Sequence, residues 1–383
     1  RFLQIWGLAR RHGLLPFRKL DFSYDPATAD LRARQARGLR EALEEAGGGF
    51  IKAGQLLSTR DDILPAEWVR ELSRLQKEVN PAPPAQIEEL LERELGERRG
   101  RFATFDVEPL AAASIAQVHR ATLDDGTVVA VKVQRPGIRA LLDCDIDIML
   151  RLAGWATRRI KQARQFGALD IAKQYAQDLR NQADFAREAS NLESLAQSAR
   201  SACDEVRIPR FFPDLSTDRV LTMEFVEGET ITALRREGQS DEIEDALRTV
   251  LRSFLRQLVI DGVFHADLHP GNVIIDPDGT PALIDFGSVG RLDRDLRQTV
   301  QDLAIAFLQG DTRRVADAAL AIMPLANPAD EPGFRRSLAE FVTHDLGSGS
   351  RITLRTIDNA SDLFTRYGSA LPADLVAAGR AFA

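Results

Sequence analysis

The spacing of hydrophobic positions divides the chain into helical and β-rich stretches. Through the first hundred residues apolar side chains recur every three or four positions, the period of an amphipathic helix. Gly47-Gly48-Gly49 and the prolines between Pro81 and Pro84 interrupt this period. The predicted helices are Arg34–Ala46, Pro65–Val79 and Pro84–Leu95.

From Phe102 onward the hydrophobic period shortens to two, as expected for half-buried β-strands. Asp124-Asp125-Gly126 separates two alternating runs and has the composition of a hairpin turn. The predicted strands of this region are Phe105–Leu110, Ile115–Thr122 and Val128–Gln134.

Helical spacing then returns, interrupted by two strand-like runs at Ile208–Phe212 and Arg219–Val226. The remaining predicted helices are Ile138–Ile160, Leu169–Ala199, Glu242–Ile260, Asp293–Leu308, Thr312–Met323, Phe334–His344 and Arg355–Tyr367. This order predicts an α+β fold in three parts. Residues 1–100 form a helical N-terminal extension, 101–226 a lobe with a five-stranded-type antiparallel sheet and a long helix, and 227–383 a helical lobe.

Composition narrows the class of protein. The 383 residues include 50 basic and 57 acidic side chains, a net charge of −7 that does not suggest a nucleic-acid partner. Two cysteines, Cys144 and Cys203, are too few for a disulfide framework and predict small buried residues in a reducing compartment. No apolar run is long enough to cross a bilayer. We expect both ends to be cut, so this says little about an anchor elsewhere.

The richest chemistry lies between Phe264 and Gly287. Asp267 precedes Asn272 by five positions, and Asp285 stands before Phe286-Gly287. In a kinase-like fold this spacing serves phosphoryl transfer from ATP. Asp267 then positions or deprotonates the acceptor, while Asn272 and Asp285 hold Mg²⁺. His265 and His269 flank Asp267 without a metal-site spacing, and we interpret His265 as a brace for the loop.

A phosphoryl-transfer site also needs a cation on the ATP phosphates. Lys132, at the end of Val129-Ala130-Val131-Lys132, has the alternating strand context of that cation, although an exposed strand lysine is the alternative. Glu188 is the preferred carboxylate partner because its neighbours share one apolar helical face. Glu193 is the competing candidate.

Two further segments are candidate nucleotide contacts. Ala111, Ala112, Ala113 and Ser114 stand where a protein kinase has a glycine-rich loop, and they predict a stiffer loop over the phosphates. An ordinary helix start or packed turn is the alternative. The stretch from Glu224 to Val226 is predicted to line the adenine at a hinge.

Four motifs occur in order: Lys52-Ala53-Gly54-Gln55, the alanine-rich loop, the lysine strand and the loop around Asp267. Together, across roughly Lys52 to Gly290, they resemble the UbiB family of atypical kinases and ATPases. The resemblance implies a protein-kinase-like bilobal fold with the helical extension packed over the active site. Lys52, Gly54 and Gln55 then carry an inhibitory or lipid-sensing role.

The sequence departs from the family pattern at one regulatory position. Where the family has Glu-x-Asp, this chain has Gln182-Ala183-Asp184. Gln182 can still form hydrogen bonds but lacks the charge that pairs with Lys52, so the Lys52 contact is left open. Asp184 is retained.

The resemblance also implies a membrane surface as a partner, with the protein on the cytoplasmic side, peripheral or anchored by a segment outside this chain. Phe2, Ile5, Trp6 and Ala9 form an apolar stripe, which is typical of an interfacial helix. Basic residues at Arg10, Arg11, Arg18 and Lys19 precede the first acid. A helix docked on its own domain is the alternative.

The leading hypothesis is therefore an ATP- and Mg²⁺-dependent atypical kinase or ATPase acting in ubiquinone-like or related lipid metabolism. Its partners are ATP and a lipid or isoprenoid-quinone precursor, not proteins, since no Ala-Pro-Glu follows Asp285-Phe286-Gly287. The alternatives are an aminoglycoside- or choline-kinase-like phosphotransferase and a nucleotide-gated, non-catalytic scaffold.

Overall fold

A computed structural model gives the fold and describes residues 1–58, 64–75, 80–160, 163–164, 167–202, 205–237, 241–323, 325, 327–345, 363 and 367. The chain forms two compact units. We call Arg1–Ala189 with Phe211–Phe225 the N-terminal unit, and Ser190–Arg210 with Val226–Ala383 the C-terminal unit. The helical extension and the sheet therefore share one unit. The three-part division remains a prediction.

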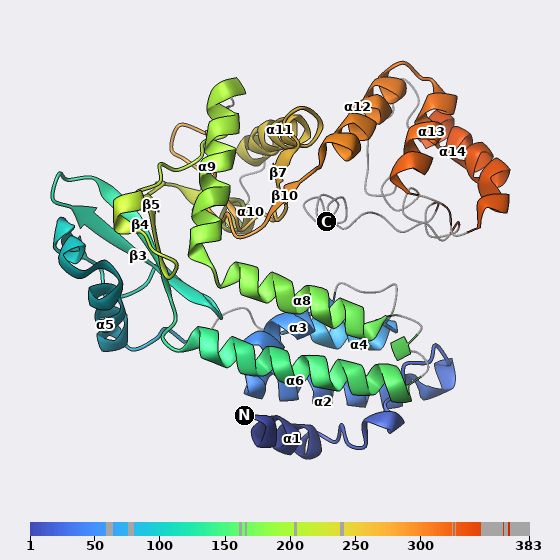
Figure 1. The fold of residues 1–383 in the computed structure, drawn as a ribbon, viewed down its shortest axis with the longest axis horizontal. Coiled ribbons are helices and arrows are strands. Elements are labelled where there is room, and N and C mark those ends of the chain that lie inside the picture. The colour runs from blue at the N-terminus through green and yellow to red at the C-terminus, as the bar shows by residue number, and fades with distance from the viewer. Residues whose placement is uncertain are drawn as a thin grey trace. The chain divides into compact units, whose positions relative to one another are not determined.

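The N-terminal unit combines one sheet with a bundle of helices that lies beside it (Figure 1). Its helices are α1 (Phe2–Arg11), η1 (Phe17–Lys19), η2 (Pro26–Thr28), α2 (Ala29–Ala46), α3 (Gly49–Leu57), α4 (Ala66–Leu72), α5 (Pro84–Leu95), η3 (Gly96–Arg101), α6 (Ile138–Arg159), α8 (Ala168–Gln182), the start of α9 (Phe185–Ala202) and η4 (Pro213–Leu215). The predicted helix Pro84–Leu95 is confirmed at both ends, and residues 76–79 of another prediction lie outside the described residues.

The sheet is antiparallel throughout. Its strands are β1 (Phe102–Phe105), β2 (Ala111–Ala112), β3 (Ala116–Leu123), β4 (Val128–Gln134) and β5 (Val220–Glu224). They follow the order β1-β3-β4-β5, with β2 also pairing with β3. The β3–β4 hairpin turns at Asp124–Gly126 as predicted, with Gly126 at φ +85°, a conformation that glycine adopts without strain.

Two strand predictions are wrong, and proline explains both. Phe105–Leu110 is not a strand, because pairing ends soon after Phe105 and Pro109 removes a ladder donor. Ile208–Phe212 forms no strand either. Pro209 lies inside this run, and its Phe211 makes a single bridge to Met223.

The helical run predicted over Leu169–Ala199 is two helices. α8 ends at Gln182, and α9 begins at Phe185. Between them, the Asp184 carboxylate accepts a hydrogen bond from the Ala186 N–H at 3.1 Å, so Asp184 satisfies an otherwise unpaired donor of α9. The sequence pattern does not reveal the break between α8 and α9, because apolar positions continue at helical spacing across it.

The two faces of the sheet have different neighbours. Val129, Val131 and Val133 point to one face and pack against the apolar stripe of α5. Because side chains alternate along a strand, Lys132 points to the opposite face, where Phe185 and Leu221 pack. The alternation of β4 therefore fixes the side on which the lysine stands.

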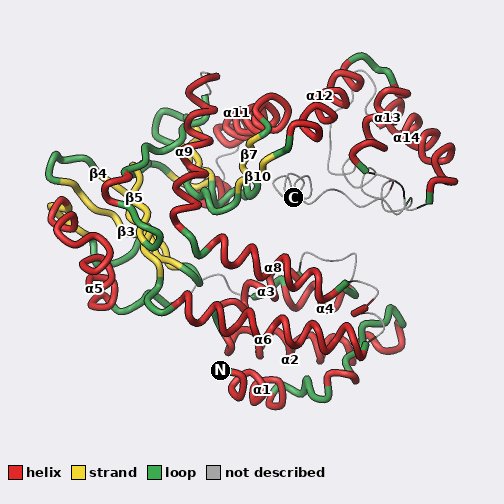
Figure 2. Tube along the Cα trace, in the orientation of Figure 1, coloured by secondary structure: helices red, strands yellow, loops and turns green. Residues whose placement is uncertain are grey.

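The C-terminal unit combines the rest of α9 with helices and two small sheets, one of the two strands β10-β7 and one of the three strands β6-β8-β9 (Figure 2). Its elements are β6 (Glu229–Thr230), α10 (Ile231–Glu237), α11 (Asp241–Arg256), the π-helical turn η5 (Gln257–Asp261), β7 (Val263–His265), β8 (Val273–Ile275), β9 (Pro281–Leu283), β10 (Val289–Arg291), α12 (Arg294–Leu308), α13 (Thr312–Ile322), η6 (Pro328–Asp330) and α14 (Glu331–Asp345). The predicted helices at 242–260, 293–308, 312–323 and 334–344 are confirmed with small shifts. Arg355–Tyr367 lies outside the described residues except Leu363 and Tyr367.

The structure describes one of the two cysteines. Cys144 is exposed, which corrects the prediction of a buried residue: it lies on the polar side of amphipathic α6. Cys203 lies outside the described residues.

Among the helices described, none combines the length and hydrophobicity needed to cross a bilayer.

The pairing of β7 with β10 positions the ends of the chemically rich segment. Gly290 lies opposite Phe264 in this pair, and His265 lies opposite Val289. The Phe264 ring is fully buried and makes an edge contact with Phe254 at 5.9 Å. It also covers Gly290 so closely that an added Cβ would lie 2.2 Å from Cζ of the ring.

We therefore predict that Gly290→Ala destabilises the protein by about 1–3 kcal/mol, the cost of overpacking a filled core. The Phe264 ring cannot yield easily because it is enclosed on all sides. Urea unfolding measures the effect, with Gly100→Ala as the control, since no atom lies within 4 Å of a Cβ there. Equal stability of the two variants would contradict this packing argument.

Candidate active site

The lysine and the glutamate singled out in the sequence form an ion pair in the N-terminal unit. Nζ of Lys132 lies 2.6 Å from Oε1 of Glu188, and the glutamate side chain is 2% exposed. The ammonium group also lies 5.4 Å from the centre of the Phe185 ring. Glu193, the competing candidate, is exposed. A buried carboxylate needs a cation beside it, so Glu188 holds Lys132 in place.

The alanine-rich segment is a tight hairpin between β2 and β3. Ala111 and Ala112 pair with β3, and the Ala113 N–H donates to the Ala116 carbonyl at 2.8 Å. Ser114 lies in the turn itself. The alternative of a helix start is therefore wrong. The loop leads into β3, whose Val118 pairs with Lys132, so it is joined to the lysine through one strand.

The predicted hinge coincides with a change of unit. Glu224 ends β5 opposite Val129 and belongs to the N-terminal unit. Val226 is buried and is the first residue of this stretch in the C-terminal unit. The chain thus passes from one compact unit to the other within the three residues predicted to line adenine.

The contact left open by Gln182 is formed. The ammonium group of Lys52 in α3 donates a hydrogen bond to Oε1 of Gln182, the last residue of α8. Gly54 permits close packing of α3, because a Cβ there would lie 2.7 Å from Leu43 and 2.3 Å from Leu75. Gln55 follows Gly54 in α3, and its side chain is half-buried. A neutral amide, that of Gln182, therefore accepts the hydrogen bond from Lys52.

In the C-terminal unit, His265 ties the Asp267 loop to the Asp285 segment. Its Nδ1 accepts a hydrogen bond from the Asp267 N–H at 3.1 Å, and its Nε2 is hydrogen-bonded to the Asp285 carbonyl. The imidazole is 1% exposed. Burial lowers its pKa, and the nearby Asp285 carbonyl and carboxylates of Asp285 and Asp267 only partly oppose this. The brace role predicted for His265 matches this geometry.

The side chains of the candidate magnesium ligands are held by backbone groups of nearby residues. Nδ2 of Asn272 donates to the Asp267 carbonyl at 3.0 Å, which leaves Oδ1 as the ligand atom of that amide. Oδ1 of Asp285 accepts the Gly287 N–H at 2.9 Å. Amide and carboxylate oxygens suit Mg²⁺, which needs few protein ligands when phosphates supply others. Within the described ranges no three His, Cys, Asp or Glu side chains form a metal cluster. Asp267 itself is exposed, as an acceptor-positioning carboxylate requires.

Two buried amides that the sequence analysis missed complete this half of the site. Nδ2 of Asn191 donates to the Phe286 carbonyl at 2.9 Å, and its Oδ1 accepts from Arg291 at 3.0 Å. Gln257, in the π-helical turn, accepts from the His265 N–H at 3.1 Å. Their only signal in the sequence is a polar residue among apolar neighbours on a helix. Such residues carry no motif, because a contact with a backbone group places no requirement on the identity of the partner residue.

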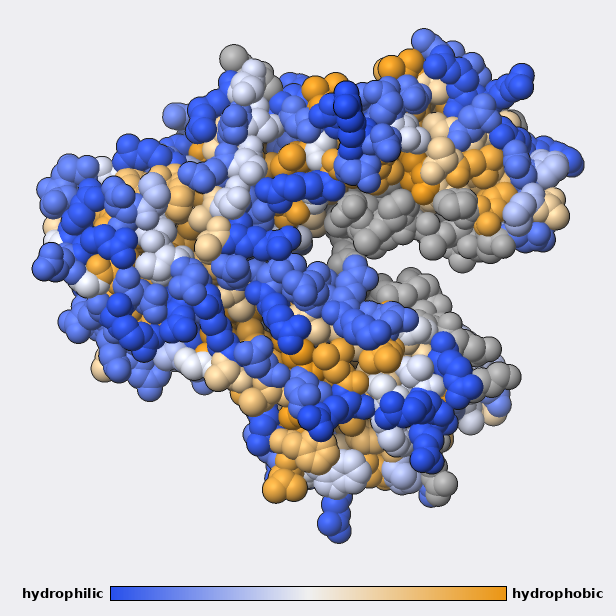
Figure 3. Space-filling model, viewed as in Figure 1, coloured by the Kyte–Doolittle hydropathy of each residue, from blue (hydrophilic) through white to orange (hydrophobic). Residues whose placement is uncertain are grey.

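The N-terminal stripe is partly buried and partly free. Ala9 is buried in the N-terminal unit with Leu8, whereas Phe2 and Trp6 are about half exposed and Leu3 is 83% exposed. Figure 3 shows hydrophobic residues at the surface around α1. The helix therefore docks on its own unit with one side and presents apolar side chains with the other.

The chain is similar to known proteins. A family model described as the ABC1 atypical kinase-like domain matches residues 74–319. A probable protein kinase UbiB from Pseudomonas putida (strain W619) is 36% identical over 318 residues, covering 82% of this chain and 58% of the relative. The chloroplastic protein ACTIVITY OF BC1 COMPLEX KINASE 7 from Arabidopsis thaliana is 35% identical over 318 residues, covering 81% of this chain and 45% of the relative. The chain thus spans about half the length of these relatives.

A solved structure agrees with the sequence relatives. The complex of Rv3197 with erythromycin from Mycobacterium tuberculosis is 25% identical, has a TM-score of 0.53, and is matched over 89% of this chain and 94% of that chain. The predicted protein-kinase-like α+β fold is confirmed together with the predicted resemblance. The chain therefore belongs to the UbiB family and carries an ABC1 atypical kinase-like domain.

Proposed function

We propose that this chain is an ATP-binding, Mg²⁺-dependent atypical kinase or ATPase that acts in or regulates isoprenoid-quinone or related lipid metabolism. The proposal places it at a membrane surface, on the cytoplasmic side, with a lipid or quinone precursor as its partner. Family membership supports the kinase class. The UbiB name of its relatives supports the pathway.

The observation that carries the proposal is the Lys132–Glu188 pair. A lysine held by a buried carboxylate at 2.6 Å keeps its charge, and it can offer that charge to the α- and β-phosphates of ATP. Ala111–Ser114 would cover the phosphates, and Glu224 with Val226 would line the adenine. Asn272 and Asp285 would hold Mg²⁺, which supplies positive charge at the transferred phosphoryl group. Asp267 would position the accepting hydroxyl or water.

We expect Asp285→Asn to lower phosphate release from Mg²⁺-ATP on the order of 100-fold, the scale of losing one preorganised electrostatic contact. Asp278→Asn serves as the matched control. It removes the same negative charge, but Asp278 lies exposed in the β8–β9 turn. The assay is run with and without anionic liposomes. Equal, measurable turnover in wild type and Asp285→Asn would contradict the role proposed for Asp285, whereas no phosphate release by either protein would point to a non-catalytic scaffold. Stoichiometric ADP release on a small soluble alcohol would point to an aminoglycoside- or choline-kinase-like enzyme.

The Lys52–Gln182 contact yields a second prediction with two opposite arms. We propose that this contact restrains phosphotransfer, so Lys52→Ala increases autophosphorylation. Gln182→Glu replaces the neutral acceptor of the Lys52 ammonium group by a charged one, which strengthens the contact and therefore reduces autophosphorylation. Lys173→Ala, which removes an exposed lysine of α8, is the control. Radiolabelled ATP measures all four proteins, and no change in either arm contradicts a regulatory role for this contact.

The third prediction concerns the protonation of His265. An amide N–H only donates and a carbonyl only accepts, so the contacts of the ring require the neutral form with its hydrogen on Nε2. The folded state then stays neutral while the unfolded state binds a proton below the ordinary value of 6.5. This contribution to stability is therefore full above that pH and is lost as the pH falls through the lowered folded pKa.

Side-chain ¹⁵N NMR of the histidines measures this state directly. We expect the His265 signal to report an Nε2–H tautomer that remains neutral at about pH 6. His265→Gln assigns the signal. A protonated His265 near neutral pH would overturn the brace described here.

A further inference from the structure

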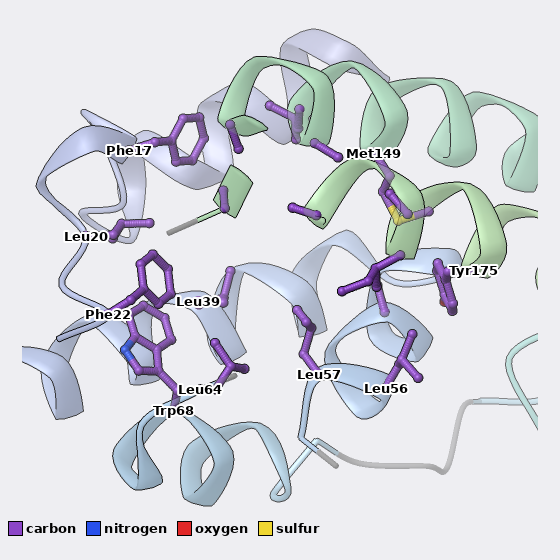
Figure 4. Close-up of a pocket in the computed structure, with 18 of the residues that line it drawn as sticks. Phe17, Leu20, Phe22, Leu39, Leu56, Leu57, Leu64, Trp68, Met149 and Tyr175 are labelled. Carbon is purple, nitrogen blue, oxygen red and sulfur yellow. The ribbon is translucent and has the colours of Figure 1, made fainter. Parts of the chain in front are cut away.

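The N-terminal unit contains an apolar cavity of about 390 Å³ that the proposed ATP chemistry does not use. Residues of α2, α3, α4, α6 and α8 line it, together with the segment 17–22. Figure 4 shows Leu56 and Leu57 of α3, Met149 of α6 and Tyr175 of α8 around the same space. This volume lies within the range of about 300–1,000 Å³ typical of ligand pockets.

The lining excludes polar ligand groups. Among the described lining residues none is charged, and the one hydroxyl, that of Tyr175, already donates to the Gly49 carbonyl at 2.8 Å. A buried headgroup would therefore lose its hydrogen bonds to water without replacement. A hydrocarbon chain loses nothing of the kind. Several lining side chains, such as Phe17 and Leu57, are only half-buried, so the cavity can be reached from outside.

A row of aromatic rings connects the cavity to the exposed side of α1. Phe2 stacks on Trp6 at 6.4 Å, Trp6 meets the edge of Phe17 at 6.2 Å, and Phe17 meets Trp155 at 5.8 Å. The last two rings line the cavity, whereas Phe2 and Trp6 are about half exposed. Exposed aromatic rings on an amphipathic helix favour the interface of a bilayer. The row thus joins the exposed apolar side of α1 to the cavity.

We infer that the cavity holds one hydrocarbon chain of a membrane lipid, acyl or isoprenoid, with the polar head left outside. The chain would lie against both α3 and α8, which are also joined by the Lys52–Gln182 and Tyr175–Gly49 hydrogen bonds. Occupancy therefore sets the spacing of these helices and the strength of the Lys52–Gln182 contact. This regulatory step rests on the proposed function, while the binding of the chain does not.

Tryptophan quenching tests the binding without ATP. The chain has three tryptophans, and Trp68 and Trp155 line the cavity. In a Trp6→Phe background, only these two report. Vesicles of dibrominated phosphatidylcholine with anionic lipid, and separately a dibrominated fatty alcohol in solution, are the probes. We expect saturable loss of emission with both, since bromine quenches on contact and Trp68 is fully buried.

Filling the cavity provides the decisive comparison. Ala153→Leu with Ala172→Leu adds side chains to its wall, and Gln174→Leu adds the same side chain to the exposed surface of α8. The filled variant should lose the quenching and keep or raise its melting temperature, whereas Gln174→Leu should keep the quenching. Ala156→Leu is the second filling variant if the first does not fold. Unchanged quenching in a folded, filled variant overturns the inference, and so does the absence of quenching by both probes.

The remaining outcomes test whether the hydrocarbon chain comes from a membrane and whether its binding regulates ATP hydrolysis. Quenching by the alcohol but not by vesicles overturns the membrane origin of the chain. A stimulation of ATP hydrolysis by vesicles that is lost in the filled variant, but not in Gln174→Leu, supports the regulatory step. Stimulation that persists in the filled variant overturns that step. If no protein hydrolyses ATP, the proposed function fails, while the quenching result still decides the binding.

Discussion

The ion pair between Lys132 and Glu188 is the interaction on which the rest of the N-terminal half-site depends. Neither charge is stable alone at such low exposure, so each requires the other. Two elementary periodicities bring them together. The alternation of β4 turns the lysine away from the valines that pack on α5, and the start of α9 places the glutamate on the same side as Phe185. The break at Ala183–Asp184 lets α9 begin where it does.

The C-terminal half-site is organised by backbone atoms rather than by side-chain charges. His265, Asn191 and Gln257 each bind a main-chain group of the segments that carry Asp267 and Asp285. Such contacts fix the loops without adding a competing charge near the metal ligands. Neutral polar groups are tolerated in a buried position because every one of them has a partner. The two groups of residues lie in different units, and their action on one nucleotide is proposed from the family.

Much of this arrangement could be predicted from the sequence. Local spacing predicts the strand Val128–Gln134, the helix Pro84–Leu95 and the ordered motifs. The apolar helical face around Glu188 favours this residue over Glu193 as the partner of the lysine. Predictions from local spacing were wrong where a single proline interrupts strand pairing, as Pro109 and Pro209 do in the two predicted strands. Local spacing also failed where a partner lies far along the chain. Asn191 and the formed Lys52–Gln182 contact join residues about a hundred positions apart, which no short motif encodes.

Helix α9 has a consequence for how this protein can vary among its relatives. Glu188 and Asn191 stand one helical turn apart, and they serve contacts in the two different units. Inserting or deleting a single residue between them would rotate one relative to the other by about 100° around the helix axis. A change of length between Glu188 and Asn191 would therefore separate the two contacts even if every remaining side chain were kept. Substitutions at the exposed positions Arg187 and Ser190 leave this spacing unchanged.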